Sequence, residues 1–441
     1  MDCKLNLIVP ALVNVFGYYT FTGTPTRYVW SSDLILLLVQ RCNKSNTTIT
    51  DCTYITYRVL EVFSVYKRHK GNFETRIKVT PFQLHKLDSG PKEEVTLTRN
   101  EGLQIYEQLR MIRCLEVRAT ELYRAQFVRG FCHLYLGQEA CCVGLRLAMR
   151  PKDSIITAYR CHGWAYVMGL TPHEVLAEMT GRKTGAVRGK GGSMHMFCPQ
   201  FYGGNAIIGA HQVPVGTGIA FAYKYRGEDG MCFACYGDGA ANQGQVFEAY
   251  NIAKLWDLPI VFVCENNLYA MGTASNRSSA NPRFYTRCDY IPGIWVDGMD
   301  VLAVREAGRF AVEWCSSGKG PLIYELHTYR YSGHSVSDPG TAYRTREEVK
   351  NVRRSRDPIE LFKMHLLSSE LATEEDIKEI DTKAKDAMDK AATKATEDPE
   401  PDLEELAGDL HLRPAEKFAR GVGPWDKFEV KSFNTPMQTL P

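Results

Sequence analysis

The 441-residue sequence lacks two features that would assign it to a special class of protein. Its longest apolar stretch, Leu5–Phe21, is short for a membrane span and is interrupted by Pro10 and Asn14. It also lacks an excess of one charge, because 53 basic and 51 acidic residues leave a net charge of +2. We therefore expect neither a membrane nor a nucleic acid as partner, and any anion site must be local.

Cysteine is abundant, with 14 residues, but the patterns that would give it a chemical role are absent. Cys232 and Cys235 form a lone CxxC without a second pair or a nearby histidine. Such a pair is compatible with a redox site or half a zinc site. It lies in the apolar run Met231–Gly239, so we expect buried strand cysteines in a reducing compartment.

Two phosphate-binding motifs are also missing. The glycine-rich stretch Gly181–Gly192 would need glycine at Thr184 and a hydroxyl residue at Gly191 to form a P-loop. Gly216–Gly218 and Gly237–Gly239 lack the third glycine of a dinucleotide fingerprint. The sequence therefore lacks the main motif that would indicate a kinase, a P-loop NTPase or a nicotinamide enzyme.

What is present is a regular alternation of short apolar runs and helical stretches. With 44% apolar and 24% charged residues, the chain can form one large or two ordinary domains. Apolar strands separated by helices predict an α/β fold, a parallel sheet with helices on both faces, followed by a C-terminal helical region. The predicted strands are Ser154–Tyr159, Cys232–Tyr236, Ile260–Cys264, Ile294–Val296 and Leu322–His327; the predicted helices are Thr98–Phe127, Pro172–Met179, Val215–Tyr225, Gln243–Leu255, Val301–Cys315 and Pro358–Thr396.

The first 70 residues differ in composition from the rest. Acidic residues are sparse there, while Ser, Thr and Arg recur, as in mitochondrial transit segments, although no Arg-rich amphipathic helix is visible. We interpret residues 1–70 as a leader or an atypical extension, 71–425 as a catalytic domain and 426–441 as a tail.

Polar residues follow two predicted strands at their carboxyl ends. Asp238, flanked by Gly237 and Gly239, follows one strand, and Asn267 follows the next strand along the chain. Ligands bind at this edge of open parallel sheets. A carboxylate, an amide oxygen and a nearby backbone carbonyl would suit Mg²⁺, and the helix that begins near Asn242 would direct its positive end toward a phosphate.

Six stretches in order make the pattern specific: GFCHLYLGQEACCVGL, ITAYRCHGWAY, GKGGSMHM, YGDGAANQGQVFEAYN, ENNLYAMGT and TYRYSGHSVSDPG. Through them the span Phe73–Trp425 resembles the alpha subunits of thiamine-diphosphate-dependent 2-oxo acid dehydrogenases, above all those that act on pyruvate. The resemblance implies the thiamine-diphosphate-binding fold.

The resemblance also implies roles for particular residues. It implies Mg²⁺ ligation by Asp238, Asn267 and the Tyr269 carbonyl, and contact with the diphosphate by Tyr159 and Arg160, with Gly239 and Ala240 beside it. It implies that Cys198, Ala206 and Ile208 line the cofactor. It also implies catalytic roles for His133 and His334 near the substrate and the lipoyl group, and regulatory phosphorylation of Ser335. A lone histidine is more often structural, and only the matched context favours catalysis.

The implied activity is decarboxylation of pyruvate and reductive acetylation of the lipoyl groups of a dihydrolipoyl acetyltransferase in the mitochondrial matrix. The implied partners are a beta subunit in an α2β2 heterotetramer, those lipoyl domains, and a regulatory kinase and phosphatase. The beta subunit would supply the glutamate that activates the cofactor, so the chain alone should be inactive. Acetoin and branched-chain 2-oxo acid dehydrogenases are the nearest alternatives.

Departures from the family pattern lie in the loop Tyr202–Pro214. Ala206 replaces a glycine, and His211 looks inserted. We expect His211 to bulge outward, because loops tolerate insertions when their ends stay fixed. If the insertion instead displaces the cofactor-binding backbone, the chain is a non-catalytic paralogue. Two other familiar phosphoserine positions are Ala274 and Ala342, and Ser332 replaces a common histidine.

Overall fold

The computed structural model describes residues 74–403, 405, 418–420, 425 and 427–429. The predicted leader, residues 1–70, lies outside the described residues, as does most of the predicted tail, 426–441. Within the described part, no helix is long and apolar enough to cross a membrane.

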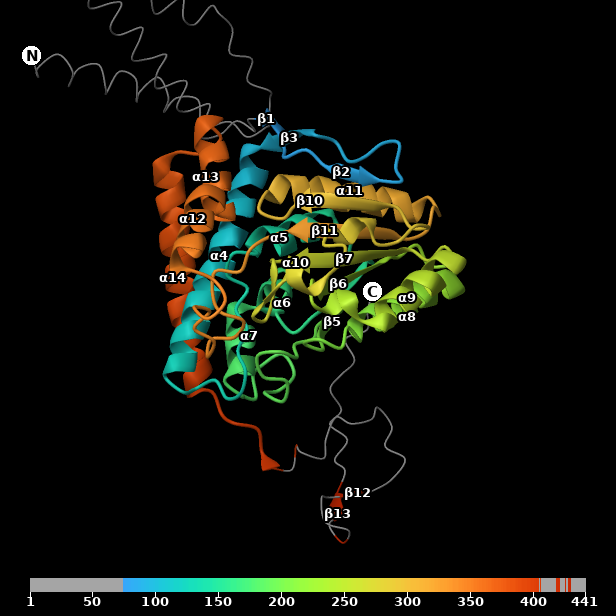
Figure 1. The fold of residues 1–441 in the computed structure, drawn as a ribbon. Coiled ribbons are helices and arrows are strands. Elements are labelled where there is room, and N and C mark those ends of the chain that lie inside the picture. Colours follow the sequence, from blue (N-terminus) through green and yellow to red (C-terminus); the bar gives the residue numbers. More distant parts are fainter. Residues whose placement is uncertain (1–73, 404, 406–417, 421–424, 426, 430–441) are drawn as a thin grey trace, which may run out of the picture. The chain divides into compact units, whose positions relative to one another are not determined.

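A seven-stranded sheet forms the centre of the described domain (Figure 1). All neighbouring strands pair in parallel except β2, which pairs antiparallel to β10 at one edge. In spatial order the strands are β2 Gln83–His85, β10 Gly293–Asp297, β11 Leu322–His327, β7 Ile260–Asn266, β6 Cys232–Gly237, β4 Ser154–Thr157 and β5 Phe201–Gly204. The five predicted strands are confirmed, and β2 and β5 are additional.

Helices cover both faces of this sheet, which explains why its central strands are continuous apolar runs. On one face, α5 (Glu139–Ala148) and α11 (Val301–Ser316) join the strands in one hydrophobic cluster. On the other, α8 (Gln212–Arg226) and α9 (Gly244–Leu255) form a second cluster. The predicted fold class is confirmed.

Alternation along β6 separates its two cysteines. Cys232 is buried in the cluster with α8 and α9, whereas Cys235 is buried in the cluster on the opposite face. Both are free thiols. Because they point to opposite faces, they cannot ligate one metal or form a disulfide with each other, and the interpretation as buried strand cysteines is confirmed.

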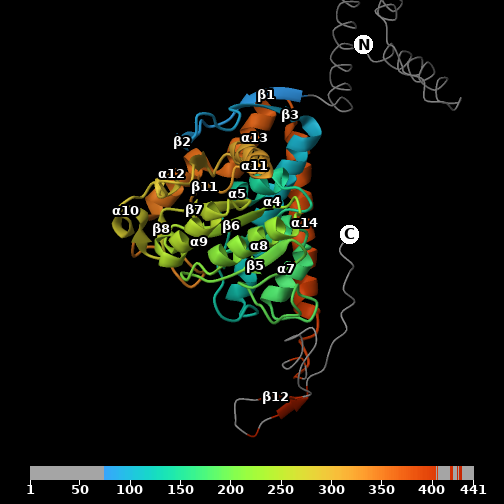
Figure 2. The same cartoon turned by 90° about the vertical axis from the view of Figure 1, so that its right-hand side faces the viewer.

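A second layer of long helices packs outside the first (Figure 2). Helix α4 (Arg99–Arg124) lies beside α14 (Glu374–Glu397), and the Tyr106 hydroxyl donates to Asp381 at 3.1 Å. The predicted C-terminal helical region is thereby confirmed. The layer also contains α7 Pro172–Met179 and α13 Pro358–Ser368, both of which contact α4. Helix α12 Arg346–Arg356 lies instead near the strands, where Glu348 accepts from the Tyr269 and Tyr329 hydroxyls.

The remaining elements are short. They comprise β1 Glu74–Lys78, β3 Glu94–Thr98, α6 His162–Val167, η1 Ala240–Asn242, β8 Tyr269–Ala270, β9 Thr273–Ala274, α10 Ser275–Ser278, η2 Phe284–Thr286, β12 Phe418–Arg420 and β13 Lys427–Glu429. Helix α6 matters most for the site, because it begins directly after Arg160 and Cys161.

The glycine-rich stretch 181–192 wraps around a carboxylate of the protein itself. Glu178, at 0% exposure, accepts backbone N–H bonds from Val187 (2.8 Å), Gly189 (2.9 Å), Gly191 (2.6 Å) and Gly192 (3.2 Å). These amides form the kind of concave nest that binds phosphate elsewhere. Here the anion is internal, which agrees with the exclusion of a nucleotide loop.

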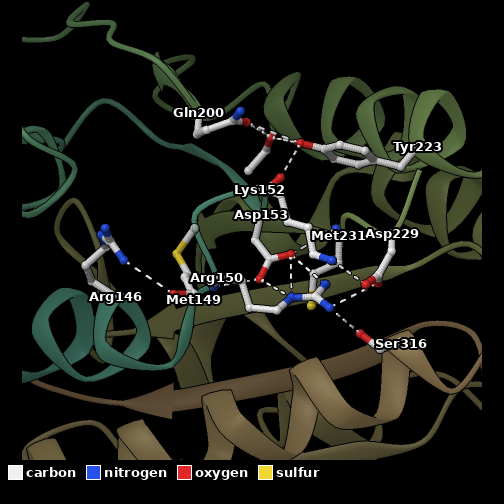
Figure 3. Close-up of polar contacts among 11 residues, drawn as sticks. Arg146, Met149, Arg150, Lys152, Asp153, Gln200, Tyr223, Asp229, Met231 and Ser316 are labelled. Carbon is white, nitrogen blue, oxygen red and sulfur yellow. Dashed lines mark hydrogen bonds and ion pairs between the residues drawn. The ribbon is translucent and has the colours of Figure 1, made fainter. Parts of the chain in front are cut away.

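An ion network secures the amino end of the sheet (Figure 3). Asp153, buried just before β4, accepts bonds from the Arg150 guanidinium (2.7 Å) and the Met231 backbone N–H (3.3 Å). Arg150 also binds Asp229 at 3.0 Å. These groups lie at the end of β4 opposite to Tyr159, so they stabilise the sheet without touching the predicted site.

Candidate active site

Asp238 lies at the carboxyl end of β6 and is almost completely buried. Strands β6 and β7 pair in parallel with Gly237 opposite Glu265, which brings the residues after both strands to one edge. Asp238 is 3% exposed, and its Oδ2 has no hydrogen-bond partner in the part of the chain that the structure describes. Burial raises the pKa of this carboxyl to about 6. A cation would relieve the cost of this buried charge.

Asn267 and Tyr269 provide further oxygens beside Asp238. The Asn267 Nδ2 donates to Gln138 Oε1 at 3.1 Å, which fixes the orientation of the amide. A side chain at Gly239 would lie 2.6 Å from the Ala270 Cβ, so the turn after β6 packs directly on β8. Only glycine permits this approach.

The donor set fits one kind of metal. Within the described residues, no group of three His, Cys, Asp or Glu side chains could hold a metal ion. A metal here would depend on the Asp238 carboxylate, the Asn267 amide oxygen and the Tyr269 carbonyl. Such hard oxygen ligands suit Mg²⁺, which retains its other positions for phosphate and water.

His133 and His334 meet beside Tyr159. Their ring centroids are 4.9 Å apart and edge-on, and the Tyr159 ring lies 4.5 Å from that of His133. The His133 Nδ1 lies 2.9 Å from the His334 carbonyl, which can only accept, so Nδ1 carries the proton. Its Nε2 is buried without a partner among the described residues. The Tyr159 hydroxyl lies 3.0 Å from His334 Nε2.

Arg160 connects the two histidine segments and contributes to the lowered pKa values of both imidazoles. Its guanidinium donates to the Leu134 carbonyl at 2.7 Å and the His334 carbonyl at 3.1 Å. Burial first, and the Arg160 cation second, lower the pKa of His133 to about 3 and that of His334 to about 4. Both imidazoles are therefore neutral at pH 7, beside two buried cations, Arg160 and Arg330. This environment favours an anionic ligand.

The predicted cofactor-lining residues lie around β5. Cys198 and Ala206 are half-buried, and Ile208 is 56% exposed. The Asn205 side chain donates to the Thr157 carbonyl at 3.3 Å, which attaches this loop to the end of β4 near Tyr159. In the described structure, no hydrogen bond joins these three residues to Asp238, His133 or His334. Ala240, in η1, is buried next to the turn of Gly239.

His211 is accommodated at the start of α8. Its side chain is exposed, and a Cβ at Gly209 would lie 2.6 Å from its Cε1. The buried Ala210 takes a left-handed conformation, with φ of +52°. The outward bulge stays a prediction; what the structure shows is an exposed His211 directly after a residue in an unfavourable left-handed conformation.

Ser335 lies in a folded loop over His334. The serine is 7% exposed, and its Oγ is 2.8 Å from that of Ser337. Asp338 holds the loop by accepting from the His334 backbone N–H (2.7 Å) and the Tyr343 hydroxyl (2.6 Å).

Three further residues belong to the site and were not predicted. Arg330, at 0% exposure, donates to the Tyr269 carbonyl at 3.4 Å. Gln138 orients Asn267, and Glu265 accepts from the Trp164 indole at 3.3 Å. Burial raises the pKa of Glu265 to about 7. Their only sequence signal is a polar residue inside a matched motif, because each role depends on a partner distant in sequence.

A match between this chain and a known protein family defines its class. Residues 107–404 match the family of dehydrogenase E1 components, which is more than half of the chain. The chain therefore belongs to the dehydrogenase E1 component family.

Individual relatives of this chain carry names that are more specific than the family. The chain is 55% identical over 368 residues to a "Probable pyruvate dehydrogenase E1 component subunit alpha, mitochondrial" of Caenorhabditis elegans, covering 83% of this chain and 92% of the relative. It is 52% identical over 368 residues to the somatic form of the mitochondrial pyruvate dehydrogenase E1 component subunit alpha of Homo sapiens, covering 83% and 94%. A type I subunit of the same name from Ascaris suum is 56% identical over 347 residues, covering 79% and 87%.

These findings confirm the predicted family and enzyme class. The names agree with the predicted pyruvate dehydrogenase alpha subunit and with the mitochondrial localisation, and they give no support to the acetoin or branched-chain alternatives. The family depends on thiamine diphosphate, which confirms that cofactor prediction.

Proposed function

We propose that this chain is the alpha subunit of a mitochondrial pyruvate dehydrogenase E1 component, which decarboxylates pyruvate and transfers the acetyl unit to lipoyl groups of an acetyltransferase. The observation that carries the proposal is the buried Asp238, whose Oδ2 has no partner among the described residues, at the same edge of the sheet as Asn267. Arg160, which donates to the His334 carbonyl, also interacts electrostatically with Asp238.

Each group in the site has a proposed task. Asp238, Asn267 and the Tyr269 carbonyl would hold Mg²⁺. Tyr159, Arg160, Gly239 and Ala240 would receive the diphosphate, while Cys198, Ala206 and Ile208 line the cofactor. Thiamine diphosphate, when bound, supplies the electron sink for decarboxylation.

The two histidines handle the substrate and protons. His133 keeps its Nδ1 proton for the His334 carbonyl and leaves Nε2 free to accept one. His334 Nε2 shares a hydrogen bond with the Tyr159 hydroxyl. Neutral imidazoles in these positions can orient a carbonyl oxygen and relay protons during transfer to the dithiolane.

Assembly and regulation complete the proposal. A beta subunit would form the other wall of the cofactor cleft in an α2β2 heterotetramer. The exposed apolar side chains of α8 and α9, including Phe221, Tyr225 and Leu255, offer a surface for a partner chain. A kinase and a phosphatase would act on Ser335. Residues 1–70 would be a leader.

Co-expression with a beta subunit tests the proposal. The complex should release CO₂ from pyruvate faster than from branched-chain 2-oxo acids, and only with thiamine diphosphate and Mg²⁺. Faster turnover of a branched-chain acid or of acetoin would identify a related dehydrogenase. A complex that assembles but neither binds the cofactor nor releases CO₂ would identify a non-catalytic paralogue, the outcome suggested by Ala206.

A further inference from the structure

Three buried polar residues form a hydrogen-bonded chain next to the site. His162, the first residue of α6, has Nδ1 at 3.0 and 3.1 Å from the two carboxylate oxygens of Glu116 in α4. Its Nε2 is 2.8 Å from the Ser193 hydroxyl. Glu116 and His162 are at 0% exposure and Ser193 is at 3%. Three such groups are buried at considerable cost unless they satisfy one another.

The trio joins segments that carry site residues. Glu116 Oε1 also accepts the backbone N–H of Tyr135 at 2.7 Å, two residues after His133. The side chain of Cys132, directly before His133, shares a hydrogen bond with Ser193. His162 follows Arg160 by two residues. The trio therefore holds the histidine segment, the Tyr159–Arg160 turn and the end of the glycine-rich stretch in one arrangement.

One of these hydrogen bonds has a definite direction. The Glu116 carboxylate can only accept, so His162 Nδ1 donates to it. On the other side of the ring, Nε2 faces both the hydroxyl of Ser193, at 2.8 Å, and its backbone carbonyl, at 3.0 Å. This order, serine to histidine to carboxylate, matches that of nucleophile triads. The burial of Ser193 leaves no room for a substrate to reach its oxygen, so attack by Ser193 is excluded.

We propose that Glu116, His162 and Ser193 are positioning residues that set the placement of His133 and of Arg160 for catalysis. The inference rests on the proposed function. Their role is geometric, because a misplacement of about 1 Å at a reacting group costs on the order of a hundredfold in rate.

Glu116→Gln is the first test, because it keeps size and shape but removes the charge and one of the two oxygens that face His162 Nδ1. The amide oxygen can still accept the Tyr135 N–H, so the variant weakens the link to His162 specifically. In the complex with the beta subunit, kcat should fall by about tenfold to a hundredfold while KM for pyruvate changes less than about threefold. Thiamine diphosphate affinity, measured by quenching of tryptophan fluorescence without substrate, should fall about tenfold.

Ser193→Ala is the milder second variant and removes only one hydroxyl. It should lower kcat and cofactor affinity in the same direction. The double variant should be no worse than the more impaired single variant, because groups that act as a unit give non-additive effects. Effects that multiply would contradict a single positioning unit.

Asp153→Asn is the matched control. Asp153 is also a buried carboxylate that accepts a backbone N–H, but it lies at the opposite end of β4. It should lower the thermal unfolding midpoint without changing kcat or cofactor affinity. If Glu116→Gln behaves like this control, the inference is wrong and the trio is only structural. If the unsubstituted complex releases no CO₂ from pyruvate, the proposed function itself fails.

Discussion

At the scale of single residues, the site contains several groups whose pKa values are shifted by burial. Asp238 is an acid whose pKa is raised to about 6, and His133 and His334 are bases whose pKa values are lowered to about 3 and about 4. All three shifts disfavour the charged form, because burial is the largest effect on each group and outweighs the attraction of nearby opposite charges, such as Arg330 for Asp238. A bound Mg²⁺ would reverse this for Asp238.

Asp238→Asn should separate binding from stability. Asp238 would be the only charged protein ligand of Mg²⁺, so cofactor affinity should fall by on the order of several kcal/mol in titration calorimetry. The thermal midpoint of the unliganded chain should not fall, because the substitution removes a buried charge whose Oδ2 has no partner among the described residues. Unchanged affinity would rule out the metal site. Asp153→Asn should show the opposite pattern.

The two histidines should make stability depend on pH. Their folded pKa values of about 3 and about 4 lie below the unfolded value of about 6.5, so the unfolded chain binds more protons between these limits. The free energy of unfolding should therefore fall as pH decreases from about 6.5 toward about 4.

Comparison of unfolding midpoints at pH 7 and pH 5 measures this effect. Asp238→Asn is the background of choice, because the raised pKa of Asp238 acts in the opposite direction. His133→Gln and His334→Gln should each reduce the loss at pH 5, whereas the exposed His211→Gln should not. If the unfolding midpoint falls equally between pH 7 and pH 5 in all variants, His133 and His334 are not the groups that make stability depend on pH.

At the scale of elements, the functional groups lie on loops whose ends are fixed by rigid strands and helices. The Ser335 loop is held by Asp338, and the His211 loop is attached to β4 through Asn205. We therefore expect a substitution, insertion or phosphorylation in either loop to change the conformation of that loop and to leave the strands and helices in place.

Phosphorylation of Ser335 should open its loop. A phosphate with a charge of roughly −2 does not fit a serine that is 7% exposed, and it would repel the cofactor diphosphate. Ser335→Glu should lower CO₂ release and increase protease cleavage within residues 332–345. Ser337→Glu, with the same charge on an exposed neighbour, should have little effect. If the Ser335→Ala enzyme is still regulated normally, the regulatory phosphorylation site is another residue.

Deletion of His211 should leave cofactor affinity unchanged or slightly higher, because the side chain is exposed and the preceding Ala210 is in a left-handed conformation that the deletion could relieve. Thiamine diphosphate titration of the complex gives the answer. A gain of more than about tenfold, roughly 1.4 kcal/mol, would mean that the insertion displaces the binding backbone. Ala210→Gly is the control, since it relieves the left-handed strain without changing loop length.

The predictability of each element follows from its environment. Strands β6 and β7 were predicted because both their faces are buried, which requires apolar runs. Strand β5 was missed because its sequence is FYGG, and β2 because it has three residues at an edge. Asp238 and Asn267 were predictable from their places at strand ends. The contact between Glu116 and Ser193 through His162 was not, because only the folded chain brings them together.

At the scale of the whole molecule, the interpretation of residues 1–70 as a leader can be tested by deletion. In the described part, every residue of the two hydrophobic clusters lies at Ile77 or later. Deletion of residues 1–65 should therefore leave heterotetramer assembly and CO₂ release intact, as measured by size-exclusion chromatography and the activity assay. A truncated chain that stays soluble but does not assemble with the beta subunit would disprove the leader interpretation.

The pairing of the first and last parts of this domain governs when it can fold. Strand β2 pairs with β10 across about 200 residues of sequence, and α4 packs on α14 across a still longer interval. During synthesis or passage into a compartment, α4 emerges long before its partner. Helices α5, α6 and α7 can cover part of its apolar surface early, but the part that packs on α13 and α14 must stay exposed until nearly the entire domain is available, which is a period of aggregation risk. We therefore expect chaperones to protect this chain during folding more than they would protect a domain of local contacts.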